Sequence, residues 1–145
     1  MAVTLSRDER DALRADVLFE LTAVGDIAKA VRSGNAVEAR RLRVCVEEDM
    51  RLLDDLGWEE LEERASFTLT MPLERLEAML RRFRDRAEED LDSCRRELNV
   101  ARHPWQKEKD YEHALDSIRQ EIDHNLDVRS ACLTALEAVG AEEDR

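Results

Sequence analysis

The stretch LERLEAMLRRFRDRAEEDLDSCRREL, residues 73–98, decides the fold of this chain. Its apolar side chains recur every three or four residues, with charged side chains between them. This apolar stripe consists of Leu73, Leu76, Leu80, Phe83, Ala87, Leu91, Cys94 and Leu98. The pattern predicts an amphipathic helix with one buried face. Pro72 fits the first turn of this helix, and Thr70 is the predicted cap.

Glycine and proline stand at the boundaries of this segment and of three others like it. Only four Gly and two Pro serve 145 residues, and Gly34, Gly57, Pro72, Pro104 and Gly140 separate the segments. Gly favours the left-handed conformation that follows a helix end, and Pro favours a helix start. We therefore predict an all-α protein, an antiparallel helical bundle of four long helices in a single domain. The predicted helices cover residues 6–33, 35–56, 72–100 and 104–139, with an acidic tail at 140–145.

Local signals define the two helices of the first hairpin. Ser6 and Glu9 have the spacing of a capping box at the start of the first helix. Asn35 is the predicted cap of the second. Gly25 lies inside the first helix, where a glycine costs about 1 kcal/mol relative to alanine. We expect a slight kink or a close helix contact there.

The segment at residues 66–71 has a different pattern. Ser66-Phe67-Thr68-Leu69-Thr70-Met71 alternates polar and apolar residues, which is typical of a strand. One short strand cannot form a sheet alone. The segment is therefore either an extended linker, the favoured alternative, or a strand that pairs with its copy in a second subunit.

The charge of the chain limits its partners. The formal net charge is −12, and residues 108–145 hold eleven acidic and four basic side chains. Such a field repels nucleic acid and anionic membranes and favours a protein partner with a basic surface. The mixed charged runs at residues 40–49 and 81–90 are interpreted as solvated helix faces, so we expect no nucleic acid and no membrane partner.

Cysteine usage and hydropathy point to one compartment. Cys45, Cys94 and Cys132 are widely spaced and lie on apolar stripes, so buried free thiols are expected. The charged residues from Arg7 onward do not resemble a secretory signal, and no apolar run approaches the length of a membrane span. We expect a bacterial, cytoplasmic protein.

The last predicted helix is much longer than the second. At 1.5 Å per residue it would extend ~50 Å, so part of its apolar stripe would stay uncovered in a bundle. This mismatch predicts either a bent helix or a partner subunit, and we expect a homo-oligomer, most simply a coiled-coil dimer.

The predicted function is that of a non-enzymatic protein–protein interaction module. No nucleophile elbow, glycine-rich loop or phosphate cradle occurs, so neither catalysis nor a cofactor is expected. The acidic face of the last helix is the predicted partner-binding surface. Its candidate residues are Asp110, Glu112, Asp116, Asp123 and Asp127.

A metal-binding carboxylate bundle is the alternative. Glu121 and His124 have the Glu-x-x-His spacing that lets two side chains of one helix share a metal ion. A di-metal bundle needs this motif on two helices, and it occurs once here. Glu20 is the candidate third ligand. A solvated acidic face explains the same residues more simply.

The two tryptophans permit a third, weaker interpretation. Trp58 and Trp105 each follow a helix boundary and are expected to cover the ends of the bundle. A small-molecule sensor would instead hold its ligand in the core around Cys94 and Trp105, which predicts a cavity there.

Part of the chain resembles a known group of proteins. The resemblance rests on four segments: residues 5–10, Val24-Gly25-Asp26-Ile27, residues 50–58 and Thr68-Leu69-Thr70-Met71-Pro72. These resemble a family of small uncharacterised actinobacterial helical proteins, in which a helical hairpin precedes an extended Leu-Thr-x-Pro segment and another helix. The resemblance covers about the first 95 residues and implies a bacterial cytosolic origin, with no activity or ligand.

Overall fold

The computed structural model describes residues 2–59, 63–64 and 67–143, and it confirms an all-α fold. The helices are α1 (Arg7–Glu20), α2 (Val24–Arg32), α3 (Ala36–Leu56), α4 (Leu73–Leu98) and α5 (Glu108–Glu143). A 3-10 turn, Leu21–Ala23, joins α1 to α2, and β1 (Ala2–Val3) and β2 (Phe67–Thr68) are two-residue strands. None of the described helices is both long and apolar enough to cross a membrane.

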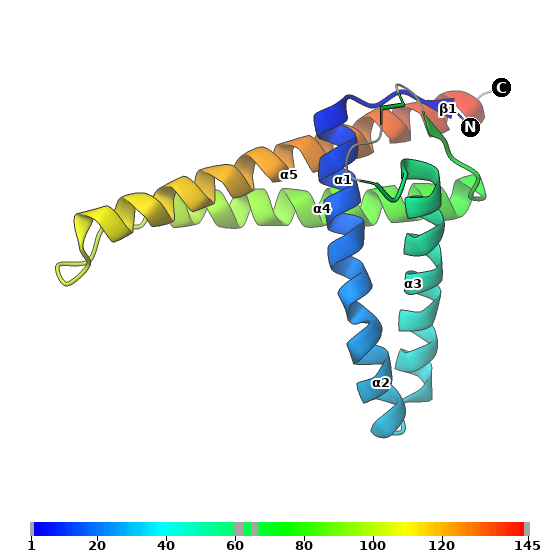
Figure 1. Ribbon diagram of the computed structural model, residues 1–145, viewed down its shortest axis with the longest axis horizontal. Helices are drawn as coiled ribbons and strands as arrows, with labels where there is room; N and C mark the ends of the chain where they lie inside the picture. The colour runs from blue at the N-terminus through cyan, green and yellow to red at the C-terminus, as the bar shows by residue number, and fades with distance from the viewer. Residues whose placement is uncertain (1, 60–62, 65–66, 144–145) are drawn as a thin grey trace.

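The helices form two hairpins that cross each other (Figure 1). Helices α4 and α5 lie antiparallel, and α1 and α2 together run antiparallel to α3. The first hairpin meets the second through α1, which packs on α5, and then projects away from it. We call α2 together with residues 36–50 of α3 the projecting arm.

The first predicted helix is interrupted. Ser6 and Glu9 form the predicted capping box, with reciprocal bonds of 3.1 Å between each side chain and the other backbone N–H. The helix does not continue unbroken to residue 33, however, because the 3-10 turn precedes Gly25. The Thr22 hydroxyl there donates to the Phe19 carbonyl at 2.7 Å. Such local side-chain bonds compete with regular helix geometry.

Helix α3 has the predicted ends. Gly34 adopts φ 76°, which suits glycine, and the Asn35 side chain accepts from the Glu38 N–H at 3.1 Å. Gly57, with φ 94°, ends the helix. Beyond this end lies Arg10 of α1, only 1% exposed, which donates to the carbonyls of Leu56 at 3.0 Å and Gly57 at 3.3 Å. It also donates to the Glu59 carbonyl at 2.5 Å.

The extended segment corrects two expectations. Phe67–Thr68 pairs antiparallel with Ala2–Val3 of the same chain, so this part of the segment is not an unpaired linker; residues 65–66 lie outside the described part. Thr70 does not cap α4, because its N–H and hydroxyl donate to Asp55 at 2.8 and 3.2 Å. Pro72 is the N-cap of α4 and makes no side-chain bond.

Helix α5 is displaced toward the C-terminus. It starts at Glu108 rather than near Pro104, since the chain makes a turn closed by the Gln106 N–H on the His103 carbonyl at 3.0 Å. At the other end it passes through Gly140 as ordinary helix instead of stopping there. A glycine is a helix stop only where the chain needs a positive φ, and Gly140 has none.

One core joins the two hairpins. It contains Phe83, Leu80 and Leu76 of α4, Val128 and Cys132 of α5, and residues of α1 and the end of α3. A fully buried side chain of this size contributes roughly 1.5–3 kcal/mol. No residue between Val17 and Leu52 belongs to the buried set of this core among the described residues. The projecting arm therefore depends on contacts between α2 and α3.

Candidate functional site

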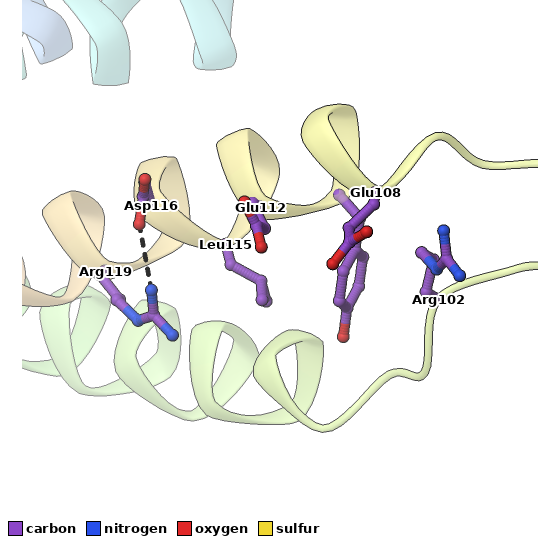
Figure 2. A pocket seen from close by; sticks show the side chains of 7 residues that line it. Arg102, Glu108, Glu112, Leu115, Asp116 and Arg119 are labelled. Carbon is purple, nitrogen blue, oxygen red and sulfur yellow. Dashed lines mark hydrogen bonds and ion pairs between the residues drawn. The ribbon is translucent and has the colours of Figure 1, made fainter.

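The candidate site is an acidic groove beside the turn that connects α4 to α5. It has a volume of about 480 Å³ and is shown in Figure 2. Its lining consists of Arg102, Glu108, Tyr111, Glu112, Leu115, Asp116 and Arg119. Residues three and four apart share one face of a helix, so 108, 112, 115, 116 and 119 form a single row along α5.

Hydrogen bonds brace the groove. The Tyr111 hydroxyl donates to the Val100 carbonyl at 2.9 Å, which ties the first turn of α5 to the chain just beyond the end of α4. Arg102 donates to the Gln106 carbonyl at 3.3 Å, and Arg119 pairs with Asp116 at 3.0 Å (Figure 2). Among the described residues, no ion pair or hydrogen bond holds the side chains of Glu108 and Glu112. These two carboxylates are available to a partner.

An exposed aromatic pair lies in the same turn. The rings of His103 and Trp105 stack with centroids 4.3 Å apart and an interplanar angle of 13°. Trp105 is 79% exposed, so the expectation that it covers the end of the bundle is wrong. Trp58, 48% exposed, donates to Asp54 at 2.5 Å and covers little. The sensor interpretation placed Trp105 in the core, and the structure does not.

Two of the five predicted partner-binding residues, Glu112 and Asp116, line the groove. Asp110 is exposed in the first turn of α5 and is not among the lining residues. Asp123 and Asp127 lie farther along α5. Burial raises the pKa of Asp127, as do the nearby charges of Asp8, Asp123 and Glu9, so this end of the row faces α1.

The three metal candidates are held apart. Glu20 binds Arg82 and Arg86 of α4, at 2.5 Å each. His124 bonds Asp16 of α1 at 2.6 Å, and Glu121 is exposed beside the Cys94 thiol. Within the described part of the chain, no three His, Cys, Asp or Glu side chains are grouped closely enough to hold a metal ion.

The burial of Asp49 and of Arg10 was not predicted from the sequence. Asp49, 0% exposed, was assigned to a solvated face, and Arg10 was not singled out. The signal was present in both cases. Asp49 continues the stripe of Leu42, Cys45 and Val46, and Arg10 precedes Leu13 by three residues.

Comparisons with protein-family models, with curated proteins and with solved structures found no match. The resemblance to actinobacterial helical proteins therefore stays a prediction.

Proposed function

We propose that this protein is a non-enzymatic interaction module whose acidic α5 groove binds a protein partner with a basic surface. The observation that carries the proposal is the pair Glu108 and Glu112, two carboxylates that have no partner within the described part of the chain and line a groove of about 480 Å³. The exposed Trp105 stands in the adjoining turn. Tryptophan and basic side chains attract one another through the negative face of the indole ring, so an arginine-rich partner suits both features.

The test reverses charge in the groove. A triple variant with Glu108, Glu112 and Asp116 changed to lysine, all three of which line the groove, is compared with wild type in capture from native cell extract, and the captured partner is then titrated in purified form. We expect weaker binding and slower association at low salt, since interface charges mainly set the association rate and its salt dependence.

The matched control has the same change in net charge on α4. It carries lysine at Glu88, Glu89 and Asp92, three exposed acidic positions outside the groove. Equal loss of binding in both variants would show a general charge effect, and unchanged association of the groove variant at low salt would disprove the proposal.

We further propose a cytoplasmic homodimer. The free thiols of Cys94 and Cys132 are buried, which suits a reducing compartment. Val37 and Val44 of α3 are exposed, 78% and 49%, and lie seven residues apart on one face. Sedimentation equilibrium of wild type and of a variant with lysine at both positions tests this: wild type should be dimeric and the variant monomeric.

A further inference from the structure

A buried ionic cluster lies where three helices meet. Glu20 is the last residue of α1 and directly precedes the 3-10 turn. It binds both Arg82 and Arg86 of α4, and Arg82 also approaches Asp49 of α3, with 3.6 Å between Nη2 and Oδ1. The cluster therefore joins the base of the projecting arm to the α4–α5 hairpin.

Asp49 is the unusual member. It is fully buried, and neither carboxylate oxygen has a hydrogen-bond partner among the described residues; the Arg82 Nε nearby is likewise buried without one. An ionised carboxylate in such a place is costly, because lost hydration is not replaced. The charged groups that act on Asp49 are Glu20 from α1 and Arg82 and Arg86 from α4.

These groups favour a protonated Asp49. Burial and then the negative charge of Glu20 raise the pKa of Asp49 to about 8, against the opposing effect of Arg82 and Arg86. With Asp49 neutral, Glu20 alone neutralises the two arginines. With Asp49 ionised, two carboxylates share these arginines, whose side chains are 35% and 36% exposed, while the charge on Asp49 itself is out of contact with water.

Because the cluster lies at the base of the projecting arm, protonation of Asp49 affects how the arm is attached to the α4–α5 hairpin. The projecting arm begins beyond the 3-10 turn, and its residues lie outside the core. We propose that Asp49 makes the base of the projecting arm a pH-sensitive joint, which is closed while this carboxyl is protonated and opens when it ionises. Opening admits water to Asp49 and separates the arm from α4.

The sign and size of the effect follow from proton linkage. In the open state Asp49 titrates as an ordinary carboxyl, so the open state binds fewer protons and is favoured as pH rises. The open population should increase by up to about tenfold per pH unit from the ordinary range of an aspartate to about pH 8, and level off above it.

Amide hydrogen exchange tests the joint. We expect exchange rates of residues 39–48, corrected for intrinsic pH dependence, to rise steeply between about pH 6 and about pH 8. Asp49→Asn, which is neutral at every pH, should abolish this rise. Glu47→Gln on the exposed side of α3 removes an equivalent charge and should retain it.

The outcomes separate this proposal from simple stability. If ionisation of Asp49 acts only through global unfolding, amides of the arm and of α4 will open with the same free energy at each pH, because global unfolding exposes both. That result, or an equal rise in Asp49→Asn, would overturn the proposal. A carbon-13 titration of the Asp49 carboxyl in the wild type is the second measurement, and a midpoint in the ordinary aspartate range would also overturn it.

Discussion

Arg10 shows how much one buried side chain can organise. A helix ends with carbonyls that lack intrahelical donors, and a buried helix end needs other donors. Arg10 supplies them to Leu56, Gly57 and Glu59 from a neighbouring helix. Charge-assisted bonds of this kind are about twice as strong as neutral ones. Arg10 thus holds α1 against the end of α3, together with Arg14, which donates to the Trp58 carbonyl.

Replacing Arg10 with methionine should lower the free energy of unfolding by about 3 kcal/mol, because buried carbonyls lose charged donors. Urea denaturation measures this. Arg7→Met is the control: Arg7 is exposed and its pair with Asp11 is 4.0 Å long, so the change should stay below about 0.5 kcal/mol. Similar losses in both variants would show that Arg10 does not brace α3.

The Asp16–His124 bond predicts a pH-dependent contact between α1 and α5. The bond to Asp16 raises the pKa of His124 above its usual value of 6.5, and burial opposes this only partly. The contact therefore contributes its full stability below about pH 6.5 and loses it as pH rises through the raised pKa.

The free energies of unfolding of wild type and of His124→Asn should accordingly differ most in mildly acidic solution and become similar in alkaline solution. His113→Asn, at an exposed position of the same helix, should show no such trend. A difference for His124→Asn that is constant with pH would contradict the expected protonated contact.

At the scale of elements, the sequence correctly predicted those helices whose boundaries depend on local interactions. The helix predicted over 72–100 is Leu73–Leu98, and that predicted over 35–56 is Ala36–Leu56, because a continuous apolar stripe defines each and Asn35 caps the second. The break before Gly25 and the late start of α5 depend on single side-chain bonds and turns. The pairing of β2 with β1 depends on a distant segment that carries no strand signal of its own.

Gly34 and Gly140 differ in backbone conformation, so replacing each with alanine tests why a helix ends at one glycine and continues through the other. Gly34 has a positive φ, so Gly34→Ala should lower the free energy of unfolding by about 1 kcal/mol. Gly140 lies in regular helix with nothing within 4 Å of an added Cβ, so Gly140→Ala should raise it by roughly 0.5–1 kcal/mol. Thermal melting compares them, and shifts in the same direction would refute this reading of the two sites.

The candidate site was only partly predictable. The acidic character of α5 follows from composition, and Glu112 and Asp116 were named. The groove itself needs Arg102 and Tyr111 placed by the turn, and the position of a turn relative to a helix depends on bonds such as that from Tyr111 to Val100. Asp123 and Asp127 were grouped with them because spacing alone does not show which length of a helix another helix covers.

In the whole molecule, one hydrophobic core lies where the two hairpins cross, and two parts extend away from it: the projecting arm, and the ends of α4 and α5 next to their connecting turn. Helices α4 and α5 extend beyond the region where α1 packs on them, and the arm extends beyond the core. Local stability should therefore be uneven along the chain. The sequence could not predict the crossing of the hairpins. Several faces of α1 and α3 are apolar enough to meet a neighbour, and long-range packing selects among them.

Hydrogen exchange at a single mildly acidic pH should reveal this unevenness. Amides of residues 26–32 and 37–45 should exchange about tenfold or more faster than those of residues 79–91, which belong to the core. Because the proposed dimer would cover Val37 and Val44 of the arm, the measurement uses the variant with lysine at both positions, and uniform protection across all helices of that variant would contradict uneven stability.

The pairing of Val3 with Phe67 has a consequence for how the chain folds. Contacts between α4 and α5 close a short stretch of chain and can form early, whereas this pairing must bring remote segments together. The first residues of the polypeptide should therefore dock late, after the central hairpin has formed. During synthesis they would wait, unpaired, until the segment that holds them has left the ribosome.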